Sequence, residues 1–359
     1  LDRGSAKRNK LKIAEEAEGL GASLKTFSGR NSFGVQISGL QPDLNKLIEL
    51  AADSMLNPAF PKDELEKLRG EVLQQLAEQD ENLFVLNSKI LRPLLYGEHP
   101  YARQTLGTAE TVKKVSSEDL KLLHQKWVQP ENLAVAFVGE ISALNALELS
   151  KQHFGAMKHG KFEAPKVALI AELPGPKSGE GEKAEITGAI LTLAFRGANL
   201  KSADHETLDL MAGLLSGLGG RLNAALREKL GLAYAVGVQN DSQLDGGSIL
   251  FYIQTDAPSL EKSLAGMWEE VKRLRDEPVP PKELESVKNY LVGTEAIELQ
   301  NQSGLAQRLA LSQLYDEGAA HVFTRKARLE KLTADDLKAA AMKYLQLEKY
   351  AKAIIKPAK

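Results

Sequence analysis

The chain has 359 residues, of which 46 are Lys or Arg and 48 are Asp or Glu, so its formal net charge is −2. Apolar residues make up 43% and charged residues 26%, which is typical of a globular protein with two or three domains. The balance of charge excludes a broadly basic surface for nucleic acid, and the absence of Cys excludes disulfides and Cys-ligated metals. The sequence contains no run of about 20 apolar residues, which is the length that would predict a membrane span.

The predicted elements of the first half begin with a strand that alternates apolar and polar residues. After it comes a helix, and then a longer helix that starts at a proline and carries apolar residues on one face. A further helix begins at a capping serine, Ser116 or Ser117. In chain order, the strands are predicted at 32–40 and 133–140, and the first two helices at 42–56 and 62–80.

The stretch 157–184 is rich in Gly, Pro and Lys and has no amphipathic period, which predicts a linker. The second half then follows a similar plan, with strands predicted at 186–198 and 246–256 and helices at 205–217 and 259–274.

An internal repeat relates the two halves. PKDELE begins at Pro61 and PPKELE at Pro280, an offset of 219 residues that also aligns Leu95-Tyr96 with Leu314-Tyr315. Two unrelated helical stretches of common composition are the alternative, but three blocks keep one order at nearly one offset. We therefore predict an α+β fold of two homologous domains, each a mostly antiparallel sheet backed by helices, at 1–156 and 185–359 with the linker 157–184 between them. The third block aligns Asp119-Leu120 with Asp336-Leu337 and Trp127 with Tyr344, at an offset of 217 residues.

Motifs for independent catalysis are missing. None of the six histidines lies in HExxH or HxxEH, the spacings that place two imidazoles beside a glutamate base on one helix face. The nearest pattern, His205-Glu206, lacks a second histidine, so we expect the histidines to be surface or packing residues and predict no metal site. There is no GxSxG elbow, and the glycine-rich segment 213–223 lacks the GK[ST] of a phosphate loop and predicts a turn. The six are His99, His124, His153, His159, His205 and His321.

The segment LREKLGLAY contains the most informative pair of polar residues. Gly231 is expected to end a short helix, so that Arg227 and Tyr234 lie on one side of a helix–strand corner. A guanidinium and a phenol can both donate hydrogen bonds to a carbonyl or carboxylate. The residues alone favour a simpler arrangement, in which Arg227 pairs with a surface acid and Tyr234 packs in the core.

This segment resembles the Arg/Tyr segment in the non-catalytic C-terminal half of pitrilysin/insulinase-type zinc metallopeptidases, which include the mitochondrial processing peptidase. The resemblance extends over nearly the whole chain, through LNPAFPKDELEKLRGEVLQQL and YGEHPYARQTLG. It implies a clamshell half, with zinc in a catalytic half that is fused upstream or separate, and a peptide or unfolded polypeptide as substrate. By resemblance, Arg227 and Tyr234 hold the substrate backbone.

The resemblance also bears on the metal ligands. The family's third zinc ligand is a glutamate in a helix where this chain has EVLQQL, and the matching residue is Gln75, a neutral amide that is a poor substitute for an anionic ligand. The family's HxxEH helix would precede Leu1, so we expect the chain to be truncated there. This chain alone is therefore predicted to be inactive, with no catalytic residue and no bound zinc.

A second function stays open. The chain could be a catalytically inert binding or scaffold protein of the same fold, like core subunits of respiratory complexes. For the compartment, the bacterial periplasm and the cytoplasm are the two candidates.

Overall fold

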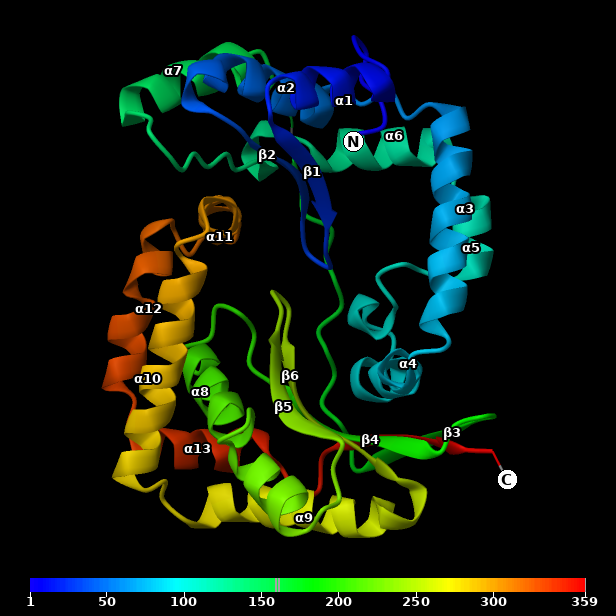
Figure 1. Ribbon diagram of the computed structural model, residues 1–359, viewed down its shortest axis with the longest axis vertical. Helices are drawn as coiled ribbons and strands as arrows, with labels where there is room; N and C mark the ends of the chain where they lie inside the picture. The colour runs from blue at the N-terminus through cyan, green and yellow to red at the C-terminus, as the bar shows by residue number, and fades with distance from the viewer. Residues whose placement is uncertain (159, 161, 359) are drawn as a thin grey trace. The chain divides into compact units, whose positions relative to one another are not determined.

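The computed structural model describes residues 1–158, 160 and 162–358, and the chain divides into two compact units (Figure 1). Unit 1 comprises residues 1–76, 105–166 and 296–323. Unit 2 comprises residues 77–104, 167–295 and 324–359.

Unit 1 is mainly helical and contains one β-hairpin. Strands β1 (Ser23–Ser28) and β2 (Phe33–Ser38) pair antiparallel. Helix α11 comes from late in the chain and contacts β2, and the hydroxyl of Tyr315 just after it donates to Ser32 Oγ at 2.9 Å. The helices of unit 1 are α1 (Lys10–Gly19), α2 (Leu44–Leu56), α3 (Lys62–Gln79), which ends in unit 2, α5 (Ala109–Lys114), α6 (Ser117–Trp127), α7 (Ala143–Phe154) and α11 (Gln302–Leu314).

Unit 2 is built on one five-stranded sheet in the order β3-β7-β4-β6-β5. Among the strands of the described residues, only β3 and β7 pair in parallel, so the predicted α+β class with a mostly antiparallel sheet is confirmed. The strands are β3 (Lys177–Lys183), β4 (Gly188–Gly197), β5 (Ala235–Ser242), β6 (Gly247–Asp256) and β7 (Ala351–Pro357). The helices are α4 (Leu83–Tyr96), α8 (His205–Leu215), α9 (Leu260–Asp276), α10 (Pro281–Glu298), α12 (Ala320–Lys331) and α13 (Ala334–Tyr344), of which α10 and α12 extend into unit 1.

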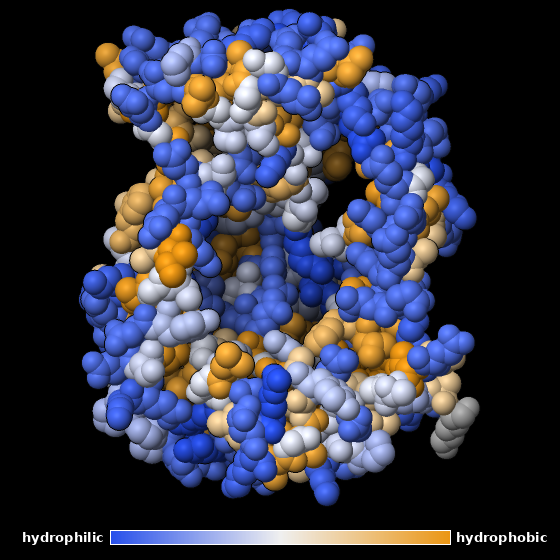
Figure 2. Space-filling view, in the orientation of Figure 1, coloured by the Kyte–Doolittle hydropathy of each residue, from blue (hydrophilic) through white to orange (hydrophobic). Residues whose placement is uncertain are grey.

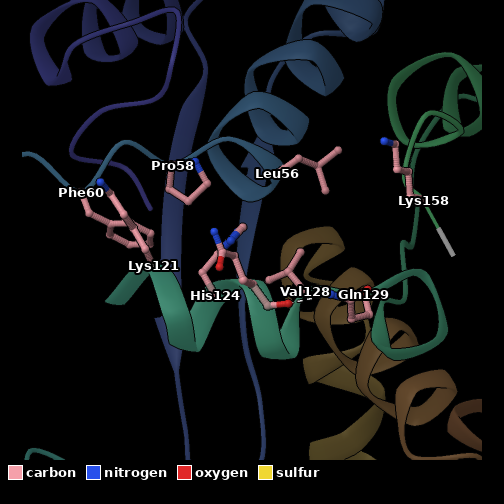
Figure 3. Close-up of a pocket in the computed structure, with 9 residues that line it drawn as sticks. Leu56, Pro58, Phe60, Lys121, His124, Val128, Gln129 and Lys158 are labelled. Carbon is pink, nitrogen blue, oxygen red and sulfur yellow. Dashed lines mark hydrogen bonds between the residues drawn. The ribbon is translucent and has the colours of Figure 1, made fainter. Parts of the chain in front are cut away.

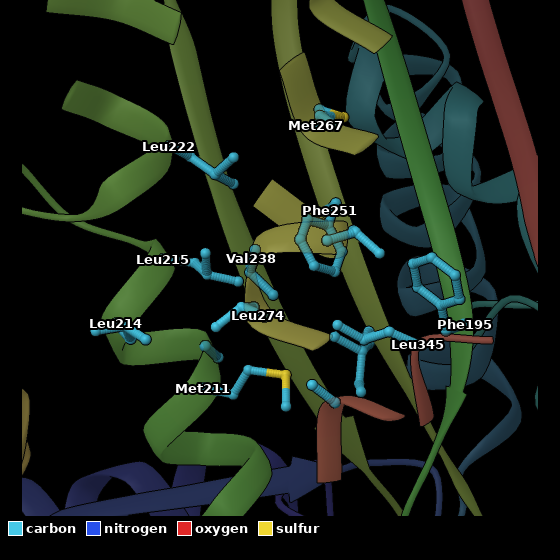
Figure 4. Packing of buried hydrophobic residues seen from close by; sticks show 14 of the residues in the cluster. Phe195, Met211, Leu214, Leu215, Leu222, Val238, Phe251, Met267, Leu274 and Leu345 are labelled. Atoms are coloured by element: carbon cyan, nitrogen blue, oxygen red, sulfur yellow. The ribbon is translucent and has the colours of Figure 1, made fainter. Parts of the chain in front are cut away.

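The main core lies between one face of this sheet and helices α8, α9 and α13 (Figure 4). Successive side chains of a strand point to opposite faces, so Phe195 of β4 faces this core while Ala194 faces α4. The rings of Phe195 and Phe251 are fully buried and meet edge to face with centroids 5.9 Å apart. The sheet that carries the candidate site is therefore covered on both faces.

The internal repeat is visible in the helices. Both α3 and α10 are 18 residues long and begin at Lys62 and Pro281, which differ by the predicted offset of 219. Helices α6 and α13 are both 11 residues long and begin with the same capping box. One pair of equivalent helices is swapped between the two units. Helix α4 of the first copy packs on the sheet of unit 2, and its counterpart α11 of the second copy contacts the hairpin of unit 1.

Two local predictions were wrong. Residues 133–140 form no strand, although the corresponding strand of the second copy, β7, is paired on both sides. Strand geometry needs hydrogen-bonding neighbours, and residues 1–156 contain no counterpart of β3 or β4. Conversely, the predicted linker contains β3, whose KSGEGEK sequence lacks apolar alternation and which is ordered by pairing with β7. The division into domains at 157–184 stays a prediction.

The face of the molecule in Figure 2 is mostly polar. Figure 2 shows hydrophilic residues over most of one face, with apolar residues scattered among them, as is normal for a folded protein in water. Among the helices of the described residues, none has the length and apolar character needed to cross a bilayer.

Candidate functional site

The corner predicted from LREKLGLAY begins with a wide helical turn. Residues Asn223–Lys229 form a π-helix, η4, a rare conformation that is frequent at functional sites. Leu226 is fully buried and packs so closely on α9 that a side chain at Gly266 would lie 2.3 Å from it. Just before η4, Arg221 donates two hydrogen bonds of 2.7 Å to Glu283 of α10. The inner side of η4 is therefore fixed and its outer side is free to present side chains.

The turn after η4 is also fixed. Gly231 has φ of 63°, the left-handed conformation that glycine adopts without strain, and its N–H donates to the Arg227 carbonyl at 3.0 Å. This confirms the predicted helix end. The carbonyl of Leu232 accepts a 2.6 Å hydrogen bond from the hydroxyl of Thr255, a fully buried residue of β6. The turn is therefore tied to the end of β6.

Tyr234 lies where the chain enters β5. Its N–H donates to the Gln254 carbonyl at 2.9 Å, which adds it to the ladder between β5 and β6. Its side chain is 60% exposed, so the expectation that it packs in the core was wrong. The hydroxyl donates to Asp256 Oδ1 at 2.8 Å, and this hydrogen bond raises the pKa of Tyr234. Tyr234 is thus held at the surface with its ring accessible.

Arg227 lies on the exposed side of η4. Within residues 1–158, 160 and 162–358, no carboxylate pairs with its guanidinium, so the expected pairing with a surface acid was also wrong. Its carbonyl anchors the turn that leads to Tyr234. The structure therefore places both residues at one backbone-defined corner of unit 2, each with an accessible polar group.

The donor set for a metal is poor. Gln75 is exposed on α3, and the neighbouring acid Glu71 is engaged by Arg3 at 2.6 Å. In the part of the chain that the structure describes, no group of three or more His, Asp or Glu side chains could hold a metal ion. These residues do not fit a zinc centre, and the assignment of Gln75 to the lost ligand position stays a prediction.

The histidines have structural partners. Burial lowers the pKa of His99 and of His124. His99 Nδ1 accepts from the Tyr101 N–H, and His124 Nε2 lies 2.7 Å from the Met55 carbonyl. Of the other four, His153 contacts Asn45, His205 and His321 each face a carboxylate one helical turn away, and His159 lies outside the described residues.

Unit 1 contains a separate pocket of about 630 Å³ that the sequence did not predict (Figure 3). His124 of α6 lies on one side, and Leu56, Pro58 and Phe60 lie on the other. The rings of Phe60 and His124 meet edge to face with centroids 5.9 Å apart. The contacts of His124 there, one ring and one carbonyl, are those of a packing residue.

Asp256 is the residue of the corner that sequence reasoning missed. It is the last residue of β6 and lies 22 positions beyond Tyr234, so only the strand register brings the two together. The one available signal was an acid at the end of a predicted strand, which is common and unspecific.

Two family models match the chain over most of its length. The model described as "Insulinase (Peptidase family M16)" matches residues 2–109, and the model described as "Peptidase M16 inactive domain" matches residues 114–291, which include Arg227 and Tyr234. The chain belongs to peptidase family M16. The resemblance to insulinase-type metallopeptidases is thereby confirmed.

Relatives of this M16 chain are named as zinc proteases. An uncharacterized zinc protease of Mycobacterium leprae is 25% identical over 99% of this chain and 80% of its own length. The uncharacterized zinc protease YmxG of Bacillus subtilis is 24% identical over 87% of this chain and 75% of its own length.

Solved structures agree with the fold of this M16 chain. The peptidase M16 inactive domain from Pseudomonas fluorescens has a TM-score of 0.89 and 26% identity, and the match covers 100% of this chain and 86% of that one. A protease from Helicobacter pylori has a TM-score of 0.86 at 20% identity and shows likeness of fold, over 99% of this chain and 86% of that one.

Proposed function

We propose that this M16 chain is the non-catalytic half or subunit of a zinc-dependent metalloendopeptidase. In this proposal, Arg227 and Tyr234 bind the backbone of a peptide substrate for a zinc centre in another half. The observation that carries the proposal is the corner itself, where two exposed polar side chains are held on a fixed backbone and Arg227 has no ion pair among the described residues. A guanidinium without a carboxylate partner has its donors available for substrate carbonyls.

The same proposal assigns the metal to the catalytic partner. Zinc there would activate a water molecule for attack on the peptide bond. The residues of this chain would contribute binding and orientation, because they hold no fitting set of zinc ligands in its described part. We therefore propose a catalytic partner, which is either fused to this chain or a separate subunit, and a peptide as the substrate.

The proposal predicts that the isolated chain binds unfolded peptide through this corner. Fluorescence anisotropy with a labelled, unstructured peptide should give a dissociation constant about tenfold higher for Arg227→Ala or Tyr234→Ala, because each variant removes a hydrogen bond to the peptide. Lys229→Ala, which removes another exposed cation of η4, and Tyr290→Ala, which removes a tyrosine of α10 that is 61% exposed, are the matched controls. If all four variants bind like the unaltered chain, the inert scaffold is the better account.

A further inference from the structure

The hydroxyl proton of Tyr234 is already donated in a hydrogen bond within the protein. A phenol has one O–H, and that of Tyr234 donates to Asp256 Oδ1 at 2.8 Å. In this state the phenol oxygen can still accept a hydrogen bond but has no proton to donate. Tyr234 therefore differs from Arg227, which can only donate.

The acceptor side of this hydrogen bond is also accessible. Thr255 is fully buried, and because successive strand residues point to opposite sides, the next residue, Asp256, points outward and is exposed. Asp256 precedes the short helix at Ala257–Ser259, yet its side chain does not cap that helix. In the described part of the chain it also forms no ion pair. Its carboxylate thus has acceptor positions beyond the one that Tyr234 fills.

We propose that Tyr234 and Asp256 form the acceptor end of the peptide-binding corner, with Arg227 as its donor end. A peptide unit has one donor, N–H, and one acceptor, C=O, so a corner with both ends binds the two groups together. The acceptor end would take a backbone N–H or the ammonium of a peptide N-terminus. This proposal rests on the proposed function and adds Asp256 as a positioning and specificity-determining residue.

The test compares two Asp256 variants by anisotropy with the same labelled peptide. Asp256→Asn keeps an oxygen for the Tyr234 hydroxyl but removes the charge, and Asp256→Ala releases the hydroxyl. Both should raise the dissociation constant about tenfold, because a hydrogen bond to a charged acceptor is lost. Glu285→Gln, at an exposed acid of α10, is the matched control and should have no effect.

Modified peptides then identify the group that is bound. If the bound group is a backbone N–H, a peptide with N-methylated backbone amides should bind equally to the unaltered chain and to Asp256→Asn. If N-acetylation alone abolishes the difference between the two proteins, the group is the terminal ammonium; if it does not, the group is a backbone N–H. Ultraviolet titration of tyrosinate, with Tyr234→Phe to identify the signal, should show a lower pKa for Tyr234 in Asp256→Asn, since the hydrogen bond to the carboxylate raises it.

The outcomes separate this inference from the proposed function. If Arg227→Ala weakens binding while both Asp256 variants bind normally, the inference fails and the proposed function stands. Tighter binding by Asp256→Ala would show that Tyr234 donates to the substrate, which also overturns the inference. If none of the Arg227, Tyr234 and Asp256 variants changes binding, both proposals fail together.

Discussion

In an assembly with a catalytic partner, replacing Arg227 and Tyr234 together by Ala is expected to lower kcat/KM for peptide hydrolysis by roughly a hundredfold. Each of the two residues is expected to contribute one hydrogen bond to the peptide. These bonds orient the peptide at the zinc centre of the catalytic partner. The measurement is steady-state hydrolysis of a fluorogenic peptide by the reconstituted assembly.

The control for this variant is Lys229→Ala with Tyr290→Phe, which changes one cation of η4 and one exposed tyrosine of α10. It should retain turnover, and assembly with the partner should be unchanged for both double variants by gel filtration. Normal turnover by the Arg227 and Tyr234 double variant would argue that the chain acts as a scaffold.

Replacing Arg8 by Met is expected to lower the free energy of unfolding by about 3–5 kcal/mol, because removal of one partner leaves buried charge uncompensated. The Arg8 side chain is 8% exposed and forms ion pairs with Glu16, Glu49 and Asp53, the last at 2.8 Å. It thereby ties the N-terminal segment to α1 and α2 of unit 1. Urea unfolding followed by circular dichroism measures the change.

Arg3 provides the matched control for Arg8. Its side chain is 21% exposed and pairs at 2.6 Å with Glu71, which is 54% exposed, and at 3.6 Å with Glu64, which is 12% exposed, so Arg3→Met should cost clearly less than Arg8→Met. Equal losses of unfolding free energy for the two variants would show that burial of the Arg8 ion pairs contributes nothing to stability.

The Arg8 cluster also predicts a loss of stability in acid. Hydrogen bonds from Arg8 hold the pKa of Glu16 and of Glu49 below the ordinary value of 4.5. A carboxylate whose pKa is lowered by folding stabilises the fold above its unfolded pKa, and this stabilisation is lost as the pH falls through its folded pKa. Unfolding of the unaltered chain should therefore become easier below about pH 4.5, and Arg8→Met should weaken that dependence.

The helices were predicted well because their signals are local. Pro61 and Pro280 mark the starts of α3 and α10, and the capping residue Ser116 marks that of α6. Such signals act within one helical turn and need no knowledge of the tertiary structure. The repeat offset then related the two halves without any structural information.

The strands were predicted less well because their stability depends on distant neighbours. Strand β3 has a polar, glycine-rich sequence and is ordered by β7, which lies far away in the sequence. Residues 133–140 have a suitable strand pattern but no pairing in the described chain. Propensity cannot supply a hydrogen-bonding partner.

Only the local part of the candidate site was predicted, because its other contacts also depend on residues that are distant in the sequence. Arg227, Gly231 and Tyr234 lie within eight positions, so a motif could place them at one corner. Their exposure and the bond from Tyr234 to Asp256 depend on how β5 aligns with β6. The register of a sheet is set by its tertiary packing, so Asp256 could not be found from sequence.

The central proposal is that the zinc centre lies in a catalytic partner half and that this chain serves it by binding the substrate. The most direct test is zinc analysis of the purified chain by mass spectrometry after incubation with zinc and gel filtration, with peptide hydrolysis measured on the same sample. The account predicts far less than one zinc per chain and no hydrolysis. One zinc per chain, together with peptide hydrolysis that a chelator abolishes, would contradict it.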